Sequence, residues 1–161
     1  MPIFNPQASF FDTILPLIRR QSVHSEIIVI DSGTINVSVE HIHIRKIQQS
    51  EFNHANTRNL ALNYEADFYL FMTQDAMPYD QHLVASLLKA FDDPDVTVAY
   101  ARQIPYADAD AIEAFARTTN YPPTSKIKSK EDLSMMGIKT FFNSDSCAMY
   151  RASYFKKVGG F

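Results

Sequence analysis

Two aspartates follow apolar runs of strand length. Asp31 comes directly after EIIVI (26–30), and Asp75 follows FYLFM (68–72) with only Thr73 and Gln74 between. A carboxylate at the end of a buried strand must be solvated, paired or bound to a ligand, because an unpaired buried charge is unfavourable. Since parallel α/β sheets bind ligands beyond the carboxyl ends of their strands, these aspartates predict one site there.

Asp75 is suited to hold a divalent cation. Mg²⁺ or Mn²⁺ commonly takes one or two protein carboxylates and fills its other positions with substrate phosphates and water. A structural alternative stays open, in which Asp75 caps the turn into Met77-Pro78. Asp31 has a similar alternative, as a turn carboxylate that accepts a hydrogen bond from its own backbone.

Other polar residues are weaker candidates for the same site. Arg58 and Asn59 belong to a predicted helix and either point at the strand ends or lie exposed. Asp145, just before an apolar strand, is a candidate for the acceptor side. His41 and His43 alternate with isoleucines, which favours a solvated strand face over a metal site.

Phosphate binding by a glycine-rich turn is excluded. The chain has four glycines in all and contains neither G-x-G-x-x-G nor G-x-x-x-x-G-K-[ST]. Proteins with those motifs hold phosphate with backbone amides at a helix start. This chain must neutralise a phosphate with a metal ion or with Arg and Lys, if it binds one.

Alternating strands and helices must position these residues. Strands are predicted at 1–4, 26–30, 41–47, 68–72, 96–101 and shortly before 152, and helices around 11–18, 55–64, 83–91, 109–117 and 152–157. This order predicts an α/β domain whose mostly parallel sheet is flanked by helices. Asn5 and Asp80 are expected to cap two of the helices, and Pro16 to kink the first.

Composition narrows the class of protein. A chain of 161 residues, 46% of them hydrophobic, suffices for a single domain over 1–161. A net charge of −3 without a basic stripe argues against nucleic-acid binding, and no apolar run is long enough to span a membrane. The lone Cys147 fits a reducing compartment, so we expect a cytoplasmic protein, with peripheral attachment to the inner face of the membrane left open.

Several motifs together resemble one known family. They are PIFNPQ (2–7), EIIVIDSGT (26–34), FNHANTRNLAL (52–62), FMTQDAMP (71–78) and SCAMYRASYFKKVGGF (146–161). In this order they resemble the family 2 glycosyltransferases of the GT-A fold. The wording FNHAxTRN and TQDAxP is similar to a bacterial rhamnosyltransferase-like branch, and the resemblance covers nearly the whole chain.

The resemblance implies a nucleotide-diphosphate-sugar donor linked to dTDP or UDP. By position, Phe4 is similar to the aromatic residue that stacks on the base, and Asp31 to the carboxylate that accepts the N–H of a pyrimidine. Asp75 is similar to the metal-binding aspartate of a D-x-D element, which implies Mg²⁺ or Mn²⁺. Further donor-pocket residues implied by the resemblance are Arg58, Asn59 and Gln74.

The activity implied is inverting transfer of a sugar such as rhamnose to a glycan or lipid-linked acceptor in polysaccharide synthesis. A base takes the acceptor proton while the metal holds the departing diphosphate. Thr73-Gln74-Asp75 keeps one of the two usual carboxylates, and the family's acidic base falls beyond Phe161. We therefore expect the donor-binding core of a longer enzyme, inactive alone. The alternative is a non-catalytic binding or interaction domain of the same fold.

Overall fold

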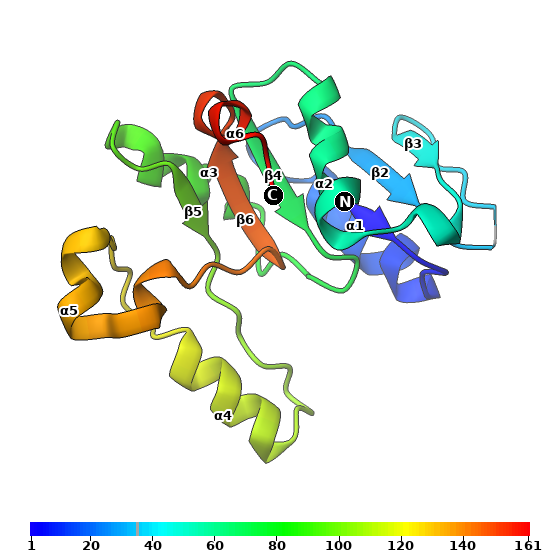
Figure 1. Cartoon of the computed structure of the whole chain (residues 1–161). Helices are drawn as coiled ribbons and strands as arrows, with labels where there is room; N and C mark the ends of the chain where they lie inside the picture. Colours follow the sequence, from blue (N-terminus) through cyan, green and yellow to red (C-terminus); the bar gives the residue numbers. More distant parts are fainter. Residues whose placement is uncertain (35) are drawn as a thin grey trace.

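The computed structural model describes residues 1–34 and 36–161. Its strands form two three-stranded sheets, ordered β1-β2-β3 and β4-β6-β5, with helices on both faces (Figure 1). The predicted α/β architecture is therefore present. The strands are β1 Pro2–Ile3, β2 Ile28–Asp31, β3 His43–Lys46, β4 Phe68–Met72, β5 Val98–Tyr100 and β6 Cys147–Arg151.

The first sheet, which we call the parallel half, contains only parallel pairs. Strand β2 lies between β1 and β3, and three of its four residues are buried. The apolar run that forms β2 suits this position, because both faces of a central parallel strand are covered. Ile3, Asp31 and Lys46 stand level at the carboxyl ends of the three strands.

The second sheet, the antiparallel half, departs from the expected parallel pattern. Strand β6 lies between β4 and β5 and runs antiparallel to both. An antiparallel strand needs no helical crossover, so the alternation of helices and strands gives no sign of its direction. The pairing brings the start of β6 beside the end of β4, where the Thr73 amide donates to the Ser146 carbonyl at 3.1 Å.

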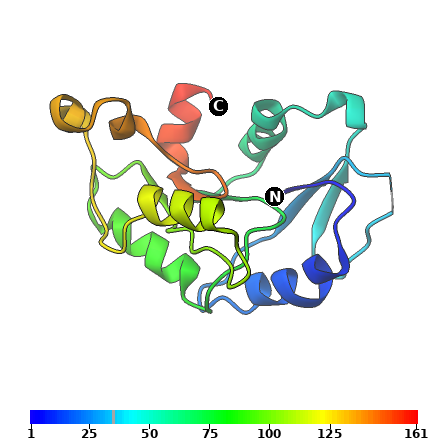
Figure 2. The same ribbon diagram turned by 90° about the horizontal axis from the view of Figure 1, so that it is seen from below.

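Helices cover the strands on both faces. The helices are α1 Leu15–Arg19, α2 His54–Asn59, α3 Leu83–Lys89, α4 Ala111–Asn120, α5 Leu133–Met136 and α6 Ala152–Val158. Figure 2 shows α1 and α3 on one side of the strands and α2 and α6 on the other. Among the described residues, no helix is long and apolar enough to cross a membrane.

The hydrophobic core joins the two halves. Val84 and Leu87 of α3 and Phe91 just after it pack under the antiparallel half, while residues before and in α1 pack under the parallel half. Met1 and Ile18 contact both clusters, so this side of the two sheets has one continuous apolar layer. The opposite side holds a separate cluster of Tyr69, Phe71, Ala152 and Phe155.

Both expected helix caps have other partners. Asn5 accepts from the Thr34 amide at 2.8 Å instead of capping the first helix. Asp80 accepts from the His82 amide in the turn before α3, and the Gln21 side chain accepts from Val84 within α3 at 3.1 Å. A π-helical turn over Phe10–Ile14 precedes α1, which has Pro16 in its first turn, and the expected kink at Pro16 stays a prediction.

A long excursion between β5 and β6 projects from the sheets and carries α4 and α5 (Figure 1). Sequence patterns predicted α4 but missed the short helical segments over 130–141. In α4 the apolar Ile112 and Phe115 are 82% and 71% exposed, while Glu113 and Arg117 lie half-buried. The spacing of apolar residues thus marks the outer face of this helix.

Candidate functional site

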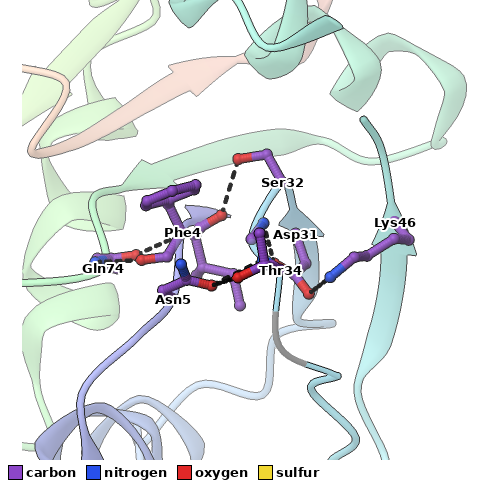
Figure 3. A network of polar contacts seen from close by, with 9 residues as sticks. Phe4, Asn5, Asp31, Ser32, Thr34, Lys46 and Gln74 are labelled. Carbon is purple, nitrogen blue, oxygen red and sulfur yellow. Dashed lines mark hydrogen bonds and ion pairs between the residues drawn. The ribbon is translucent and has the colours of Figure 1, made fainter. Parts of the chain in front are cut away.

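The loops that follow β1 and β2 are joined by hydrogen bonds (Figure 3). Ser32 donates from its amide to the Ile3 carbonyl at 3.1 Å and from its hydroxyl to the same oxygen at 3.3 Å. The Asn5 side chain accepts from the amide and the hydroxyl of Thr34. These bonds fix the shape of the carboxyl edge of the parallel half.

Asp31 is buried within this edge, with 1% of its surface exposed. One carboxylate oxygen accepts from the Gly33 amide at 2.8 Å, and the other lies 2.8 Å from the Lys46 ammonium group. The structure therefore shows Asp31 as a turn carboxylate that accepts a hydrogen bond from its own backbone segment. Its contact with a nucleotide base remains a prediction. Such a contact requires the half-exposed Lys46 side chain to move away from Asp31.

Gly33 makes the close approach of the two loops possible. A β-carbon at this position would lie 2.6 Å from Asn5 Oδ1 and 2.7 Å from the Asn5 backbone nitrogen. Any larger residue would push the two loops apart, because these distances are far below van der Waals contact. The Ser32-Gly33 turn thus sets the separation between Asp31 and the residues that follow β1.

Phe4 and Gln74 connect the two halves. The Phe4 amide donates to Gln74 Oε1 at 2.7 Å, and Gln74 Nε2 donates to the Phe4 carbonyl at 3.3 Å. The Phe4 ring remains 44% exposed, as an aromatic that receives a ligand must be. The structure therefore brings Phe4, Gln74 and Asp31 into one contiguous edge (Figure 3).

Asp75 differs from Asp31 in having an open carboxylate. The turn after β4 is closed by the backbone, with the Ala76 amide donating to the Thr73 carbonyl at 3.2 Å. Tyr106 donates to the Asp75 carbonyl, and in the described part of the chain nothing donates to the exposed carboxylate itself. The turn-cap alternative gains no support, and the side chain is free to accept a cation.

Arg58 and Asn59 extend from α2 in different roles. Asn53 caps this helix by accepting from the amides of Ala55 and Asn56. Arg58 Nη1 donates to the His54 carbonyl at 3.0 Å, whereas its buried Nε has no partner among the described residues. Asn59 exchanges two hydrogen bonds with the Phe161 backbone and so holds the Gly-Gly-Phe segment.

Asp145 belongs to a polar cluster that sequence reasoning found only in part. It accepts from the Tyr150 hydroxyl at 2.6 Å and from Asn143 at 3.4 Å. Burial and the hydrogen bond to Asp145 raise the pKa of Tyr150 well above that of an exposed tyrosine. Tyr150 and Asn143 were missed, as was Lys46. For Lys46 a signal existed, since it lies near the carboxyl end of the predicted strand over 41–47.

Two hollows lie beside the strands. The larger, about 430 Å³, lies at the amino ends of β2 and β3, away from the predicted site, and is lined in part by His24, Glu26, His41 and His43. Both predicted solvated histidines are exposed there, and His43 faces Glu26 at 3.3 Å. Within the described residues, no group of three or more His, Cys, Asp or Glu could hold a metal.

The smaller hollow, about 200 Å³, lies between β3 and α2. Its walls include Arg45 and Ile47 from the end of β3 and Asn56 and Thr57 from α2. It therefore opens beside the carboxyl end of the parallel half, next to Lys46. None of the predicted site residues is among the residues that line it.

Comparison with known proteins places this fold and site in a family. The sequence matches the profile of glycosyl transferase family 2 over residues 1–159. It is 38% identical to the O-antigen chain rhamnosyltransferase RfbN of Salmonella typhimurium, covering all of this chain and 54% of that protein. The chain belongs to glycosyl transferase family 2, as the sequence motifs predicted.

Further similarities agree with this membership. The O-antigen chain rhamnosyltransferase WbaN of Salmonella anatum is 42% identical over 85% of this chain and 46% of its own length. The chain thus spans about half the length of the curated relatives it matches. The resemblance to a rhamnosyltransferase-like branch of the family is confirmed.

Solved structures share the fold at low sequence identity. The mannosyltransferase PcManGT from Pyrobaculum calidifontis, in complex with GDP-Man and Mn²⁺, aligns with a TM-score of 0.60 at 15% identity over 99% of this chain and 45% of its own. TarS 1–349 from S. aureus aligns with a TM-score of 0.62 at 15% identity over 98% of this chain and 47% of its own. The predicted GT-A fold is confirmed.

Proposed function

We propose that this chain binds a nucleotide-diphosphate sugar and forms the donor-binding part of a glycosyltransferase that transfers rhamnose to a growing glycan. The observation that carries the proposal is the carboxyl edge of the strands. An exposed aromatic ring (Phe4), a buried carboxylate (Asp31) and an open carboxylate (Asp75) lie at the ends of β1, β2 and β4. The choice of rhamnose rests on the similarity to the two O-antigen rhamnosyltransferases.

The parallel half supplies the pocket for the base. The Phe4 ring offers an exposed face for stacking, a contact typically worth about 1–3 kcal/mol per base. Asp31 offers an acceptor for the N–H of a uracil or thymine ring when Lys46 moves aside. Because Lys46 is half-exposed, its ammonium group can be solvated after that movement at little cost.

The antiparallel half supplies the diphosphate end. Asp75 would hold a divalent cation, whose charge would neutralise the diphosphate as it departs. One carboxylate suits Mg²⁺ or Mn²⁺, since phosphate oxygens and water complete the coordination. Arg58 adds a second positive charge on the face covered by α2, and its Nε is buried without a partner among the described residues.

The acceptor approaches from the start of β6. Asp145 and Tyr150 present a carboxylate and a hydroxyl there, groups that pair with sugar hydroxyls. In this arrangement Asp145 orients the acceptor, while the inverting displacement uses an acidic base from a segment after Phe161. Asn59 holds the backbone of Phe161 beside α2.

A thermal-shift screen of this chain tests donor binding. We expect dTDP or UDP to raise the melting temperature, ADP and GDP to raise it less, and Mn²⁺ to increase the shift for dTDP or UDP. Ligand at a hundred times its dissociation constant stabilises by about 2.7 kcal/mol, which corresponds to roughly 5–10 °C for a domain of this size. The absence of any shift with all four nucleotides would contradict the proposal.

A further inference from the structure

We infer that Gln74 is a positioning residue: its side-chain amide joins the two sheets and holds the Phe4 backbone, and with it the Phe4 ring, at the mouth of the donor pocket. This inference rests on the proposed function, because it gives the Phe4 ring a ligand to stack on. It assigns Gln74 a role through Phe4, and not as a ligand of the metal or the donor.

The seam between the sheets lacks a backbone connection at this point. Strands β1 and β4 belong to separate sheets, and among the described residues no ladder pairs them. Gln74 fills this gap by accepting from the Phe4 amide and donating to the Phe4 carbonyl. One side chain thus replaces the pair of hydrogen bonds that a neighbouring strand would exchange with a single residue.

The base of Gln74 is itself fixed. The preceding residue, Thr73, donates from its backbone to the Ser146 carbonyl at 3.1 Å, and its carbonyl accepts from Ala76 in the turn. On the other side, Asn5 is held by Thr34. Phe4 therefore lies between two anchored segments, one from each sheet, and Gln74 is the link from the antiparallel half.

The pair of bonds requires one donor and one acceptor at the end of a side chain of this length. Asparagine is one methylene shorter, and methionine has a similar length without a strong donor or acceptor. An ionised glutamate accepts from the Phe4 amide but presents a second negative oxygen to the Phe4 carbonyl. A protonated glutamic acid restores both bonds, because it has one acceptor oxygen and one hydroxyl donor.

Hydrogen exchange at the Phe4 amide tests the link without any ligand. We expect Gln74→Met to lower the protection of this amide at least tenfold at pH 7. For Gln74→Glu we expect partial protection at pH 7, rising toward the parent value as the pH falls to about 4, near the pKa of an ordinary glutamate. Gln103→Met is the matched control, since it removes a glutamine hydrogen bond to Ser144 and leaves Phe4 alone.

Calorimetry with dTDP then tests the positioning role. Gln74→Met should bind dTDP about three- to tenfold more weakly than the parent, and Gln103→Met should bind like the parent. Unchanged Phe4 protection in Gln74→Met overturns the inference, and so does lost protection with unchanged affinity. A parent chain that binds no nucleotide refutes the proposed function instead, and Phe4 exchange alone then decides whether Gln74 joins the sheets.

Discussion

The aspartates at the strand ends of the two halves have opposite surroundings. In the parallel half, Asp31 is 1% exposed and both of its oxygens have partners. In the antiparallel half, Asp75 is exposed and its turn is closed by a backbone hydrogen bond from Ala76 to Thr73. A carboxylate that stabilises its own loop can be identified by its partners, whereas a carboxylate with no protein partner is available to a ligand.

This difference suggests a division of labour within the donor pocket. The parallel half builds a rigid edge before any ligand arrives, with the Asn5–Thr34 and Ser32–Ile3 bonds holding the loops. Such preorganisation lowers the entropy lost when a base binds. The antiparallel half leaves its charged group open, and in the proposed function a cation and the diphosphate would complete it.

Replacing Asp31 should have the largest effect on stability. Its position at a strand end suggests by itself that Asp31→Ala leaves the fold intact, but its burial revises that expectation. The variant loses hydrogen bonds to a charged group, so the free energy of unfolding should fall by about 2–3 kcal/mol. Guanidinium denaturation measures it, with Asp75→Ala as the control at less than about 0.5 kcal/mol. Equal losses of unfolding free energy in Asp31→Ala and Asp75→Ala would contradict the proposed difference between the two halves.

The buried thiol of the antiparallel half gives a pH-dependent test. Burial raises the pKa of Cys147 to about 12. The folded state keeps the neutral thiol, so this stability is fully present below the pKa of an exposed thiol, about 8.5, and is lost as the pH rises toward about 12. Above about pH 8.5, the pKa of an exposed thiol, the free energy of unfolding of the parent should fall by up to about 1.4 kcal/mol per pH unit relative to Cys147→Ala. Parallel pH profiles for the two proteins would show that the thiol is not buried.

Replacing the exposed histidines should have the smallest effect. The double variant His41→Ala with His43→Ala changes two exposed residues, one in the turn before β3 and one in β3, away from the strand carboxyl ends. We expect its free energy of unfolding to stay within about 0.5 kcal/mol of the parent and its Mn²⁺-dependent nucleotide binding to be unchanged. Loss of that metal dependence would show that the cation binds at the histidines and not at Asp75.

The sequence predicted the fold class and the edge at which the candidate residues gather, because both follow from local patterns. The apolar runs marked β2 and β4, and the residues directly after them marked the site. His41 and His43 were correctly predicted to be solvated, although only His43 belongs to a strand and His41 lies in the turn before it. Family membership followed from motifs in a fixed order along nearly the whole chain.

The rest depends on contacts between distant segments. Lys46 reaches Asp31 only because β3 pairs with β2 in a particular register. Gln21 accepts a hydrogen bond from Val84, 63 residues away along the chain, and displaces Asp80 from the expected cap. The direction of β6 and the outward apolar face of α4 also depend on tertiary packing, which outweighs local propensity.

Calorimetric titration of dTDP into the parent and into Asp75→Asn, with and without Mn²⁺, tests the central claim most directly. Asn keeps the shape of the side chain but removes the charge that a hard cation prefers. We expect Mn²⁺ to tighten dTDP binding by the parent, and Asp75→Asn to melt like the parent while losing that metal-dependent gain entirely. An Asn variant that binds dTDP and Mn²⁺ as tightly as the parent would contradict the account.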